Sequence, residues 1–390
     1  MEYKLEEICE FIRNGASIKQ DDNIIGYPIT RIETIANSYI DLNRMGYAGI
    51  VELGKLEEYL LSDGDILMSH INSEKHLGKT AIYENCKTKI IHGMNLLCLR
   101  PRKELVIPKY LNYYFNNVTF RKQLPKITKK SVNQASFSVT DLKNIKISLP
   151  KKDTQIKIVE ILEKAQELID KRKEQIEALD ELVKSKFIEM FGNLKNEEKV
   201  PLEKCTTFID YRGKTPTLSD NGIRIINAKS VGNGFFKYIE EYISEETYNL
   251  WMKRGFPVAG DVLFVTEGHT FGNVCRIPND LTKFAMGQRV ITMQGENGML
   301  NNAFLAQYMQ SMAFKIDIDK YKTGSSAQGI RSKELQKILI PIPDIKFQNQ
   351  FADFVKQVEK LKLEMEQSLK ELEDNFNSLM QRAYKGELFN

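Results

Sequence analysis

Gly64-Asp65-Ile66-Leu67 is followed about 195 residues later by Gly260-Asp261-Val262-Leu263, so the chain contains one short motif twice. A longer match follows each copy. Residues 141–150 read Asp-Leu-Lys-Asn-Ile-Lys-Ile-Ser-Leu-Pro, and residues 334–343 read Glu-Leu-Gln-Lys-Ile-Leu-Ile-Pro-Ile-Pro. Five residues beyond each final proline, a glutamine (Gln155 or Gln348) opens a charged, amphipathic segment. The chain is therefore expected to be a duplicated unit of globular domain plus helix, a shape that suits a partner with two similar, separated binding positions.

A heptad pattern runs through both amphipathic segments. In the first, the positions spaced alternately by four and three residues are Ile158, Leu162, Ala165, Ile169, Arg172, Ile176, Leu179, Val183, Lys186 and Met190. In the second they are Phe351, Val355, Val358, Lys362, Met365, Leu369, Leu372, Phe376, Leu379 and Ala383. Eight of ten and nine of ten are apolar, as in a coiled-coil seam. Each segment could instead pack on its own domain, but two such helices without another apolar partner nearby in the sequence favour pairing with each other.

The linker after the first helix decides how the two helices pair. A helix of about 35 residues is roughly 50 Å long, whereas residues 191–200 reach at most about 35 Å when fully extended. Parallel pairing would require the chain to travel back over the whole helix, and antiparallel pairing requires no return. We therefore predict a long antiparallel two-helix coiled coil that separates the two globular domains and gives the chain pseudo-twofold symmetry.

Each globular domain is expected to be α+β. Short strand-like runs at residues 66–68, 80–83 and 95–99 are separated by Gly and Asn turn signals. Pro108 is expected to begin a helix that continues to Gln123. Many short strands with few helices are typical of a mixed α/β domain rather than a Rossmann sheet. The predicted boundaries are 1–150 and 193–343 for the globular domains, and 151–192 and 344–390 for the helical regions.

Composition places the chain among globular proteins of the cytoplasm. Its 390 residues allow two domains, and 42% hydrophobic with 28% charged residues fit a soluble protein. The longest apolar runs are too short to span a bilayer, and the N-terminus lacks the apolar core of a signal peptide, so no membrane partner is expected. Five scattered cysteines indicate reduced thiols without a disulfide frame or zinc site; they are Cys9, Cys86, Cys98, Cys205 and Cys275.

Enzyme signatures do not fit this sequence. Gly78-Lys79-Thr80 and Gly213-Lys214-Thr215 lack the glycine five residues earlier that a Walker A loop requires. The four histidines form neither an H-E-x-x-H pair nor a cluster with cysteine, and no serine lies in a G-x-S-x-G elbow. We therefore expect no catalytic residue and no metal site.

Three loop regions recur in both copies, and their composition suits DNA. The early turn contains Ser17, Lys19 and Gln20 in one copy and Arg212, Lys214 and Thr215 in the other. The region after the Gly-Asp strand contains Ser69, His70, Ser73, Lys75, His76 and Lys79, against Thr266, Glu267, His269 and Thr270. The region before the last strand contains Lys126, Lys129, Lys130, Asn133 and Gln134, against Lys322, Ser325, Ser326, Gln328 and Arg331. Lys and Arg neutralise phosphates, while Asn, Gln, Arg and Glu pair with base edges. Any single one is also typical of a solvated turn, and it is the recurrence that favours a DNA-binding surface.

The order of these motifs resembles the specificity subunit of type I restriction–modification systems. The matching stretches are Tyr211-Arg212-Gly213-Lys214-Thr215-Pro216, both Gly-Asp strands, Gln328-Gly329-Ile330, the Ile340-Pro341-Ile342-Pro343 strand with Gln348 after it, Met190-Phe191-Gly192 and the closing Ala383-Tyr384-Lys385-Gly386-Glu387-Leu388-Phe389. The resemblance covers the whole chain. The early turn of the first copy departs from it, because Arg13-Asn14-Gly15-Ala16-Ser17 lacks the Lys-Thr-Pro form.

The resemblance implies a function that spacing alone does not. Each globular domain would be a target-recognition domain that reads one half of an asymmetric, bipartite double-stranded DNA target, and the helices would set the gap. Two methyltransferase subunits would bring S-adenosylmethionine, and two restriction subunits would use ATP and Mg²⁺, so this chain would be no enzyme and would have no cofactor of its own. Three alternatives stay open: a partner in which methyltransferase and nuclease are fused, a coiled-coil adaptor whose ends bind proteins, and an enzyme acting alone.

Overall fold

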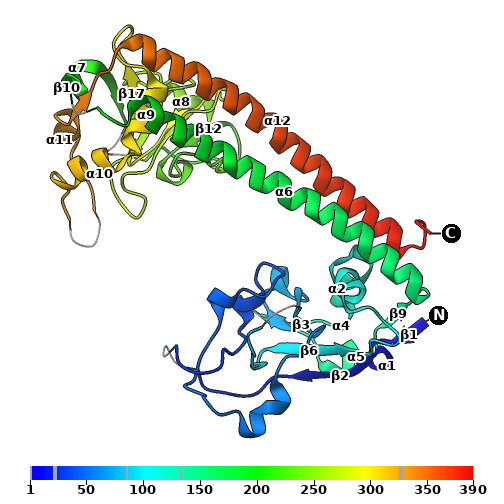
Figure 1. Cartoon of the computed structure of the whole chain (residues 1–390). Helices are drawn as coiled ribbons and strands as arrows, with labels where there is room; N and C mark the ends of the chain where they lie inside the picture. The colour runs from blue at the N-terminus through cyan, green and yellow to red at the C-terminus, as the bar shows by residue number, and fades with distance from the viewer. Residues whose placement is uncertain are drawn as a thin grey trace. The chain divides into compact units, whose positions relative to one another are not determined.

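The computed structural model of the chain describes residues 2–20, 24–84, 87–131, 134–194, 196–211, 213, 215–324 and 328–389. The chain forms two compact units (Figure 1). Unit 1 comprises Met1–Lys173 and Ser368–Asn390, and unit 2 comprises Glu174–Gln367. Each long helix therefore contributes one part to each unit.

Unit 1 is built around a four-stranded antiparallel sheet. Its strand order is β2 (Cys9–Asn14), β6 (Leu96–Pro101), β3 (Ile66–Ser69) and β5 (Thr80–Ile82). Two smaller sheets join β1 (Glu2–Lys4) to β9 (Lys146–Ser148), and β4 (Ile71–Asn72) through β8 (Ala135–Ser136) to β7 (Lys129–Lys130). The helices are α1 (Leu5–Ile8), α2 (Pro108–Asn116), α3 (Val118–Arg121), α4 (Leu124–Ile127), α5 (Val139–Lys143) and the start of α6 (Lys152–Phe191).

Unit 2 repeats the four-stranded and two-stranded sheets, and its three-stranded sheet comes from other segments. Its four-stranded antiparallel sheet has the order β11 (Thr206–Asp210), β17 (Val290–Gly295), β14 (Val262–Val265) and β15 (Val274–Arg276). The smaller sheets are β10 (Lys199–Pro201) with β18 (Leu339–Pro341), and β13 (Tyr242–Ile243), β12 (Ile223–Ile226) and β16 (Ala285–Met286). The helices are α7 (Leu202–Cys205), α8 (Glu245–Trp251), α9 (Asn302–Met309), α10 (Met312–Asp319), α11 (Ser332–Gln336) and the start of α12 (Ile345–Tyr384). The prediction of two similar mixed α/β domains is confirmed.

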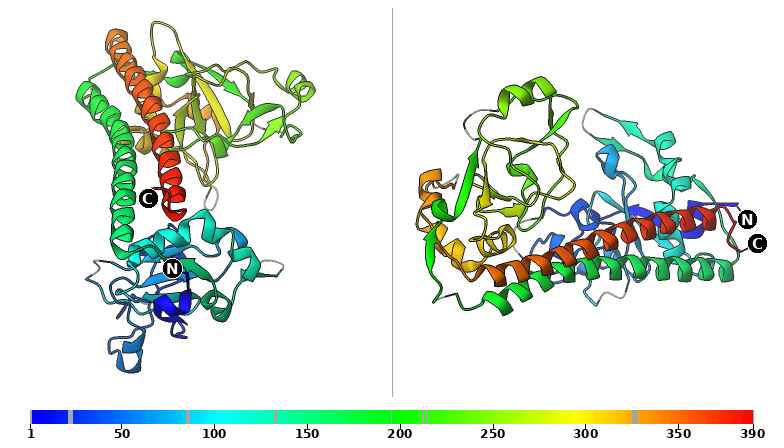
Figure 2. Two further views of the ribbon diagram at one scale, coloured as in Figure 1. Left: turned by 90° about the vertical axis from the view of Figure 1, so that its right-hand side faces the viewer. Right: turned by 90° about the horizontal axis from the view of Figure 1, so that it is seen from above.

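The two long helices pair in an antiparallel sense within each unit. In unit 1, Leu162 near the start of α6 shares a hydrophobic core with Met380 near the end of α12. In unit 2, the Phe187 ring near the end of α6 lies 5.4 Å from the Phe351 ring near the start of α12. Figure 2 shows these helix segments beside one another in each unit. The antiparallel pairing predicted from the linker length is therefore confirmed. Within the described ranges, every helix is too short or too polar to traverse a lipid bilayer.

The helix predicted from Pro108 to Gln123 is broken at Asn117. The backbone of Asn117 is extended, with φ −77° and ψ 149°. Its side chain is buried, accepts a hydrogen bond from the Thr119 N–H (2.7 Å) and donates one to the Met380 carbonyl (3.2 Å). One asparagine thus caps α3 and binds α12, which a continuous helix would not allow. The loop region expected before the last strand of unit 1 likewise contains the end of α4 and the β7–β8 hairpin.

A buried glutamine holds the first turn of each long helix against the loop that follows the central sheet. In unit 1, the Gln155 Oε1 accepts a hydrogen bond from the Ile107 N–H (2.9 Å), and its Nε2 donates to the carbonyls of Leu105 (3.1 Å) and Pro150 (3.0 Å). Gln348 makes the same three bonds in unit 2; its partners are Asn301, Met299 and Pro343. Both side chains are buried. We call this arrangement the glutamine clamp. Each helix begins three residues before its glutamine, so the glutamines do not open the helices as expected.

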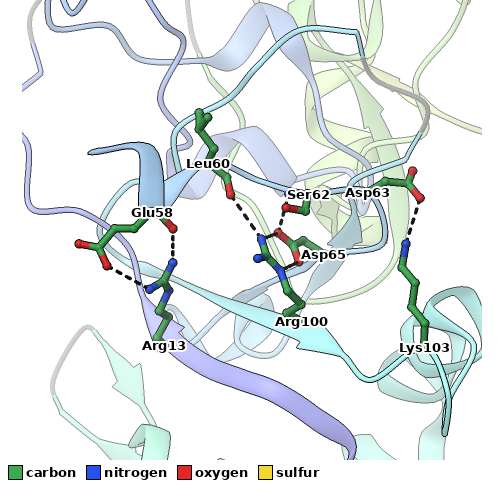
Figure 3. Close-up of polar contacts among 8 residues, drawn as sticks. All are labelled: Arg13, Glu58, Leu60, Ser62, Asp63, Asp65, Arg100 and Lys103. Carbon is green, nitrogen blue, oxygen red and sulfur yellow. Dashed lines mark hydrogen bonds and ion pairs between the residues drawn. The ribbon is translucent and has the colours of Figure 1, made fainter. Parts of the chain in front are cut away.

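The aspartate of each Gly-Asp motif is buried and supports the turn before its strand. Asp65 accepts hydrogen bonds from the Ser62 N–H (2.7 Å) and from the Arg100 guanidinium, through Nε (2.8 Å) and Nη2 (2.7 Å) (Figure 3). Asp261 accepts the matching backbone bond from Val258 (2.8 Å). Its side-chain donors are the neutral amides of Gln294 (2.7 Å) and Asn302 (3.3 Å). Because no described cation pairs with it, burial raises the pKa of Asp261.

Replacing Gln155 or Gln348 by leucine is expected to lower the free energy of unfolding by about 2–4 kcal/mol. Leucine keeps a similar volume but leaves one N–H and two carbonyls without partners in a buried site. Denaturant unfolding of the full chain measures the loss, and faster hydrogen exchange at Ile107 or Asn301 locates it.

Gln166→Leu is the matched control for the clamp variants, because Gln166 lies on α6 and makes an exposed bond to Asp170. We expect this substitution to lower the free energy of unfolding by less than about 0.5 kcal/mol. A control that loses as much as the clamp variants would show that the buried bonds do not cause the effect.

Asp65→Asn and Asp261→Asn are expected to differ, although the two residues hold matching positions. Asp65→Asn leaves the Arg100 guanidinium without its counter-ion and is expected to cost about 2 kcal/mol. Asp261→Asn is expected to stay within about 1 kcal/mol of the wild type, because Gln294 and Asn302 can rotate their amides to pair with it.

Asp261→Asn is also expected to change the pH dependence of stability. The raised pKa of Asp261 means that folding favours its protonated form, so its contribution to stability is present below the unfolded pKa and lost as pH rises through the folded pKa. Asp261→Asn should therefore gain stability relative to the wild type between pH 4 and neutral pH. Thermal unfolding over that range measures this gain, and equal losses in both variants would contradict the assignment.

Candidate nucleic-acid interface

The two ends of each central sheet lead to different parts of the unit. In unit 1, Asn14 at the end of β2 pairs with Leu97, and Ser69 at the end of β3 pairs with Leu96, so both strands finish where β6 begins. The segments after β2 and β3 therefore leave from this end, which we call the loop end. The opposite end, where β6 finishes, leads into the residues that the glutamine clamp holds; we call it the helix end.

Unit 2 has the same two ends. Asp210 at the end of β11 pairs with Ile291, and Val265 at the end of β14 pairs with Val290, the first residue of β17. The early turn and the region after the Gly-Asp strand follow these strands in both units. Strand register thus brings two of the three predicted loop regions to the loop end of each sheet.

A docked hairpin adds the third predicted region to the loop end. In unit 1, β7 and β8 form a hairpin that pairs with β4 through Ile71 and Ser136. In unit 2, Thr323 pairs with Gly329, which also bridges to Glu267. One backbone bond is common to both units: Phe137 donates to the His70 carbonyl (3.1 Å), and Ile330 donates to the Thr266 carbonyl (2.9 Å). We use docked hairpin for the paired residues Lys129, Lys130, Ala135 and Ser136 of unit 1 and for Thr323 and Gly329 with their described neighbours in unit 2.

The predicted site residues fall into four groups. The exposed ones are Ser17, Lys19, Ser73, Lys75, Lys126, Lys129, Lys130, Gln134, Thr215, Glu267, His269, Gln328 and Arg331. The half-buried ones are Gln20, His76, Lys79, Thr270 and Lys322, and the buried ones are Ser69, His70 and Thr266. Asn133, Arg212, Lys214, Ser325 and Ser326 lie outside the described residues, as does Cys86. Burial favours a role for Ser69, His70 and Thr266 in holding the docked hairpin rather than in touching DNA.

Several of the predicted cations already have partners within their unit. Lys130 forms an ion pair with Glu74 (2.7 Å), and Lys322 pairs with Asp319 (3.3 Å). Lys79 donates to the Ala36 carbonyl (2.8 Å). The pair of Lys130 and Glu74 joins the hairpin to the segment after β4, and both side chains are mostly exposed. Exposed pairs of this kind are weak and contribute little to the stability of the unit.

A hollow of about 320 Å³ lies at the loop end of unit 2. It is lined by Thr266, Glu267, Gly268, Arg289, Thr323, Gly324, Gly329, Ile330 and Arg331. The second and third predicted regions therefore meet around one concave surface. Arg289 was not among the predicted site residues. Aligning Gly287-Gln288-Arg289-Val290 with Gly93-Met94-Asn95-Leu96 would have found it, because both stretches lead into the same strand of the repeat.

Among the predicted site residues at the loop end of unit 1, His70 has an unexpected environment. It occupies the place of Thr266 in the repeat, is 94% buried (6% exposed), and lies 6.3 Å from the Phe137 ring in an edge-on arrangement. Its Nδ1 has no hydrogen-bond partner among the described residues. Burial lowers the pKa of His70 to about 4, so the imidazole is neutral at physiological pH. His92 was expected to be a hydrogen-bonded structural residue, and its Nε2 does bond the Leu96 carbonyl (2.9 Å).

The described cysteines offer no reactive thiol. Cys9, Cys98, Cys205 and Cys275 are free and buried. Burial raises the pKa of Cys9, Cys205 and Cys275 to about 12, so these thiols do not ionise at neutral pH. Nor do three or more His, Cys, Asp or Glu side chains come together as metal ligands within the described ranges.

Comparison with known proteins gives consistent matches over the chain. The family model described as type I restriction modification DNA specificity domain matches residues 1–179 and again residues 200–374. The putative type I restriction enzyme MjaX specificity subunit of Methanocaldococcus jannaschii is 32% identical over 382 residues, which cover 92% of this chain and 86% of that protein. The type I restriction enzyme EcoKI specificity subunit of Escherichia coli K12 is 26% identical over 160 residues, which cover 40% of this chain and 34% of that protein.

Solved structures share the fold at low sequence identity. A chain from a study of complex assembly and conformational transition of the type I R-M system matches with a TM-score of 0.60 at 16% identity, over 100% of this chain and 98% of that one. The S subunit of a type I restriction-modification system from M. genitalium matches with a TM-score of 0.53 at 12% identity, over 98% of this chain and 95% of that one. At these identities the likeness concerns the fold alone.

The buried His70 is expected to make unit 1 sensitive to acid. Its folded pKa of about 4 lies below its ordinary value of 6.5, so the unfolded chain binds the extra proton first. Stability is therefore complete above pH 6.5 and falls as pH is lowered towards 4. His92, whose pKa is also lowered to about 4, adds a second loss over the same range. Thermal unfolding between pH 4 and 7 measures the sum.

His70→Thr, which introduces the residue of the second copy, is expected to reduce this pH dependence without abolishing it. The part that remains includes the contribution of His92. A variant with the same pH profile as the wild type would mean that His70 is not buried in its neutral form.

Proposed function

The chain belongs to the type I restriction modification DNA specificity family, and we propose that each of its two units reads one half of an asymmetric, bipartite DNA target. The chain is thus a DNA-recognition component without catalysis of its own. In this proposal residues 1–150 and 193–343 are the target-recognition domains, and residues 151–192 and 344–390 are the helical regions. The complex would act in the cytoplasm, where its DNA lies.

One observation supports this proposal most directly: two matching loop ends carry different side chains on a common frame. The docked hairpin presents Lys129 and Lys130 in unit 1, where unit 2 has Thr323 and Gly324. The buried position beneath it is His70 in one unit and Thr266 in the other. Matching central sheets place these side chains at the same end of each unit, so the difference in chemistry favours two different base sequences.

Charge and polarity at the loop ends fit double-stranded DNA. Exposed lysines on and beside the docked hairpin of unit 1 can neutralise phosphates and set the register of the protein on the duplex. In unit 2 the exposed set includes Glu267, Gln328 and Arg331, side chains that pair with base edges in the major groove. A net charge of only +4 over the whole chain is compatible with this, because the positive charge is local.

The helices would set the gap between the half-targets and bind the other subunits. Each helix contains 40 residues, which corresponds to about 60 Å. Apolar side chains remain on their outer faces at matching heptad positions: Leu168 is 55% exposed and Leu361 is 41% exposed. Such positions favour docking of two methyltransferase subunits, which bring S-adenosylmethionine. Two restriction subunits that use ATP and Mg²⁺ would complete the cutting enzyme, whether separate from or fused to the methyltransferase.

Methylome sequencing of cells that carry this chain with its methyltransferase partner tests the proposal. We expect one split, adenine-methylated motif. Exchanging residues 193–343 for the corresponding domain of another family member is expected to change one half of that motif and to leave the other half intact.

Two outcomes would contradict the proposal. A change in both halves would mean that the units do not read DNA independently. Absence of salt-dependent DNA binding by the complex would favour a protein-binding adaptor, because phosphate contacts predict a steep fall in affinity with salt.

A further inference from the structure

We propose that Arg289 and Glu267 together read one G·C base pair, with the Arg289 guanidinium on the guanine edge and the Glu267 carboxylate on the cytosine amino group. This inference rests on the proposed DNA-recognition function and names the residues that give unit 2 part of its specificity. Three features of the loop end support it: the backbone conformation of Arg289, the hollow that its side chain lines, and the charge of the pair.

The backbone of Arg289 is in a conformation that arginine rarely adopts. Its φ is 63°, in the left-handed region that favours glycine and asparagine. The matching residue of unit 1 is Asn95, with φ 78°. The frame imposes this conformation in unit 2, because the Arg289 carbonyl accepts hydrogen bonds from the Thr266 N–H (2.9 Å) and from its Oγ1 (3.2 Å). Asparagine adopts such a backbone conformation more readily than arginine does. The presence of arginine here therefore points to a role for its side chain.

The Arg289 side chain contacts Glu267 through one nitrogen, and its terminal nitrogens have no hydrogen-bond partner among the described residues. Its Nε lies 3.2 Å from the Glu267 Oε1, and the two side chains are 58% and 56% exposed. A guanidinium has five donors in a planar fork. With the carboxylate beside Nε, the outer edge of the fork remains for a bidentate contact with guanine O6 and N7.

The hollow beside the ion pair gives a base edge room to approach. Three of its lining residues are glycines, Gly268, Gly324 and Gly329, which present backbone instead of side chains. A Cβ added at Gly329 would lie 3.1 Å from the Glu267 Cβ, which is closer than an ordinary van der Waals contact. The docked hairpin therefore lies directly against the residue that orients Arg289. The hollow also places Arg331 near the pair as a further cation.

The charge of the pair favours a base over a phosphate. Glu267 neutralises Arg289 and would repel a phosphate that approached the same spot. A G·C pair instead presents acceptors on guanine and an amino donor on cytosine, which match a guanidinium beside a carboxylate. The exposed Lys126 and Lys129 are better suited to phosphate.

The test uses the full chain in complex with its methyltransferase partner and the Arg289→Asn variant. Asparagine is the residue that unit 1 has at this place, so the melting temperature should be unchanged or higher. We expect the methylated motif to lose its preference at one G·C pair in one half, and the affinity for the wild-type target to fall about 10- to 100-fold. DNA in which that pair is already changed should bind wild type and variant equally.

Two further variants make the test specific. Lys283→Asn removes an equally exposed cation that is paired with Glu245 and lies outside the hollow, and it should leave the motif unchanged. Glu267→Gln should relax preference at the same base pair as Arg289→Asn, since Glu267 positions the guanidinium. Relaxation at another pair, or none, would overturn the proposed role of Glu267.

The outcomes separate this inference from the proposed function. A wild-type complex that methylates no discrete motif contradicts the proposed function itself. A wild-type motif that survives Arg289→Asn without change overturns the inference alone. A uniform loss of affinity on all DNA sequences, with a salt dependence reduced by about one charge, would identify a phosphate contact and overturn it as well.

Discussion

The rest of each unit depends on the hydrogen bonds that one buried glutamine side chain makes at the first turn of each long helix. Gln155 and Gln348 each satisfy an N–H and two carbonyls that would otherwise be buried without partners. A displaced helix would leave all three groups unpaired, and each such group costs about 1–3 kcal/mol. The glutamine clamp therefore specifies where each helix meets its sheet, and the helix end of each unit is a rigid frame.

In each unit, the residues that stabilise the fold and the residues proposed to read DNA lie at opposite ends of the central sheet. The helix end carries the clamp and the helices, and the buried aspartates at the Gly-Asp turns stabilise the strand starts there. The loop end carries the variable side chains on the docked hairpin and on the turn before β6 or β17. An antiparallel sheet allows this division, because successive strands bring distant loops to the same end. Side chains at the loop end can therefore change without disturbing the clamp.

The two copies show how far a common frame tolerates different chemistry. In unit 1 the buried Asp65 pairs with Arg100, whereas in unit 2 the matching Asp261 accepts its side-chain hydrogen bonds from neutral amides. Each aspartate also accepts the same backbone hydrogen bond. The left-handed position before the central strand accepts Asn95 in one copy and Arg289 in the other. The backbone bond is kept at the aspartate and the positive φ is kept at the position before the central strand, while the side chains differ. Specificity can thus diverge between halves of one chain while the fold stays constant.

The paired helices and the two similar domains were predictable from the sequence pattern. The heptad spacing predicted the paired helices, the linker length predicted their antiparallel sense, and the repeated motifs predicted two similar domains, because each depends on residues close in sequence. The break at Asn117, the clamp made by Gln155 and Gln348, and the hollow beside Arg289 were not predictable in this way. Each depends on partners that lie far away along the chain, as when Asn117 bonds the Met380 carbonyl. Only the tertiary structure brings such groups within hydrogen-bond distance. Periodicity in the sequence does not show which distant carbonyl a given side-chain amide will bond.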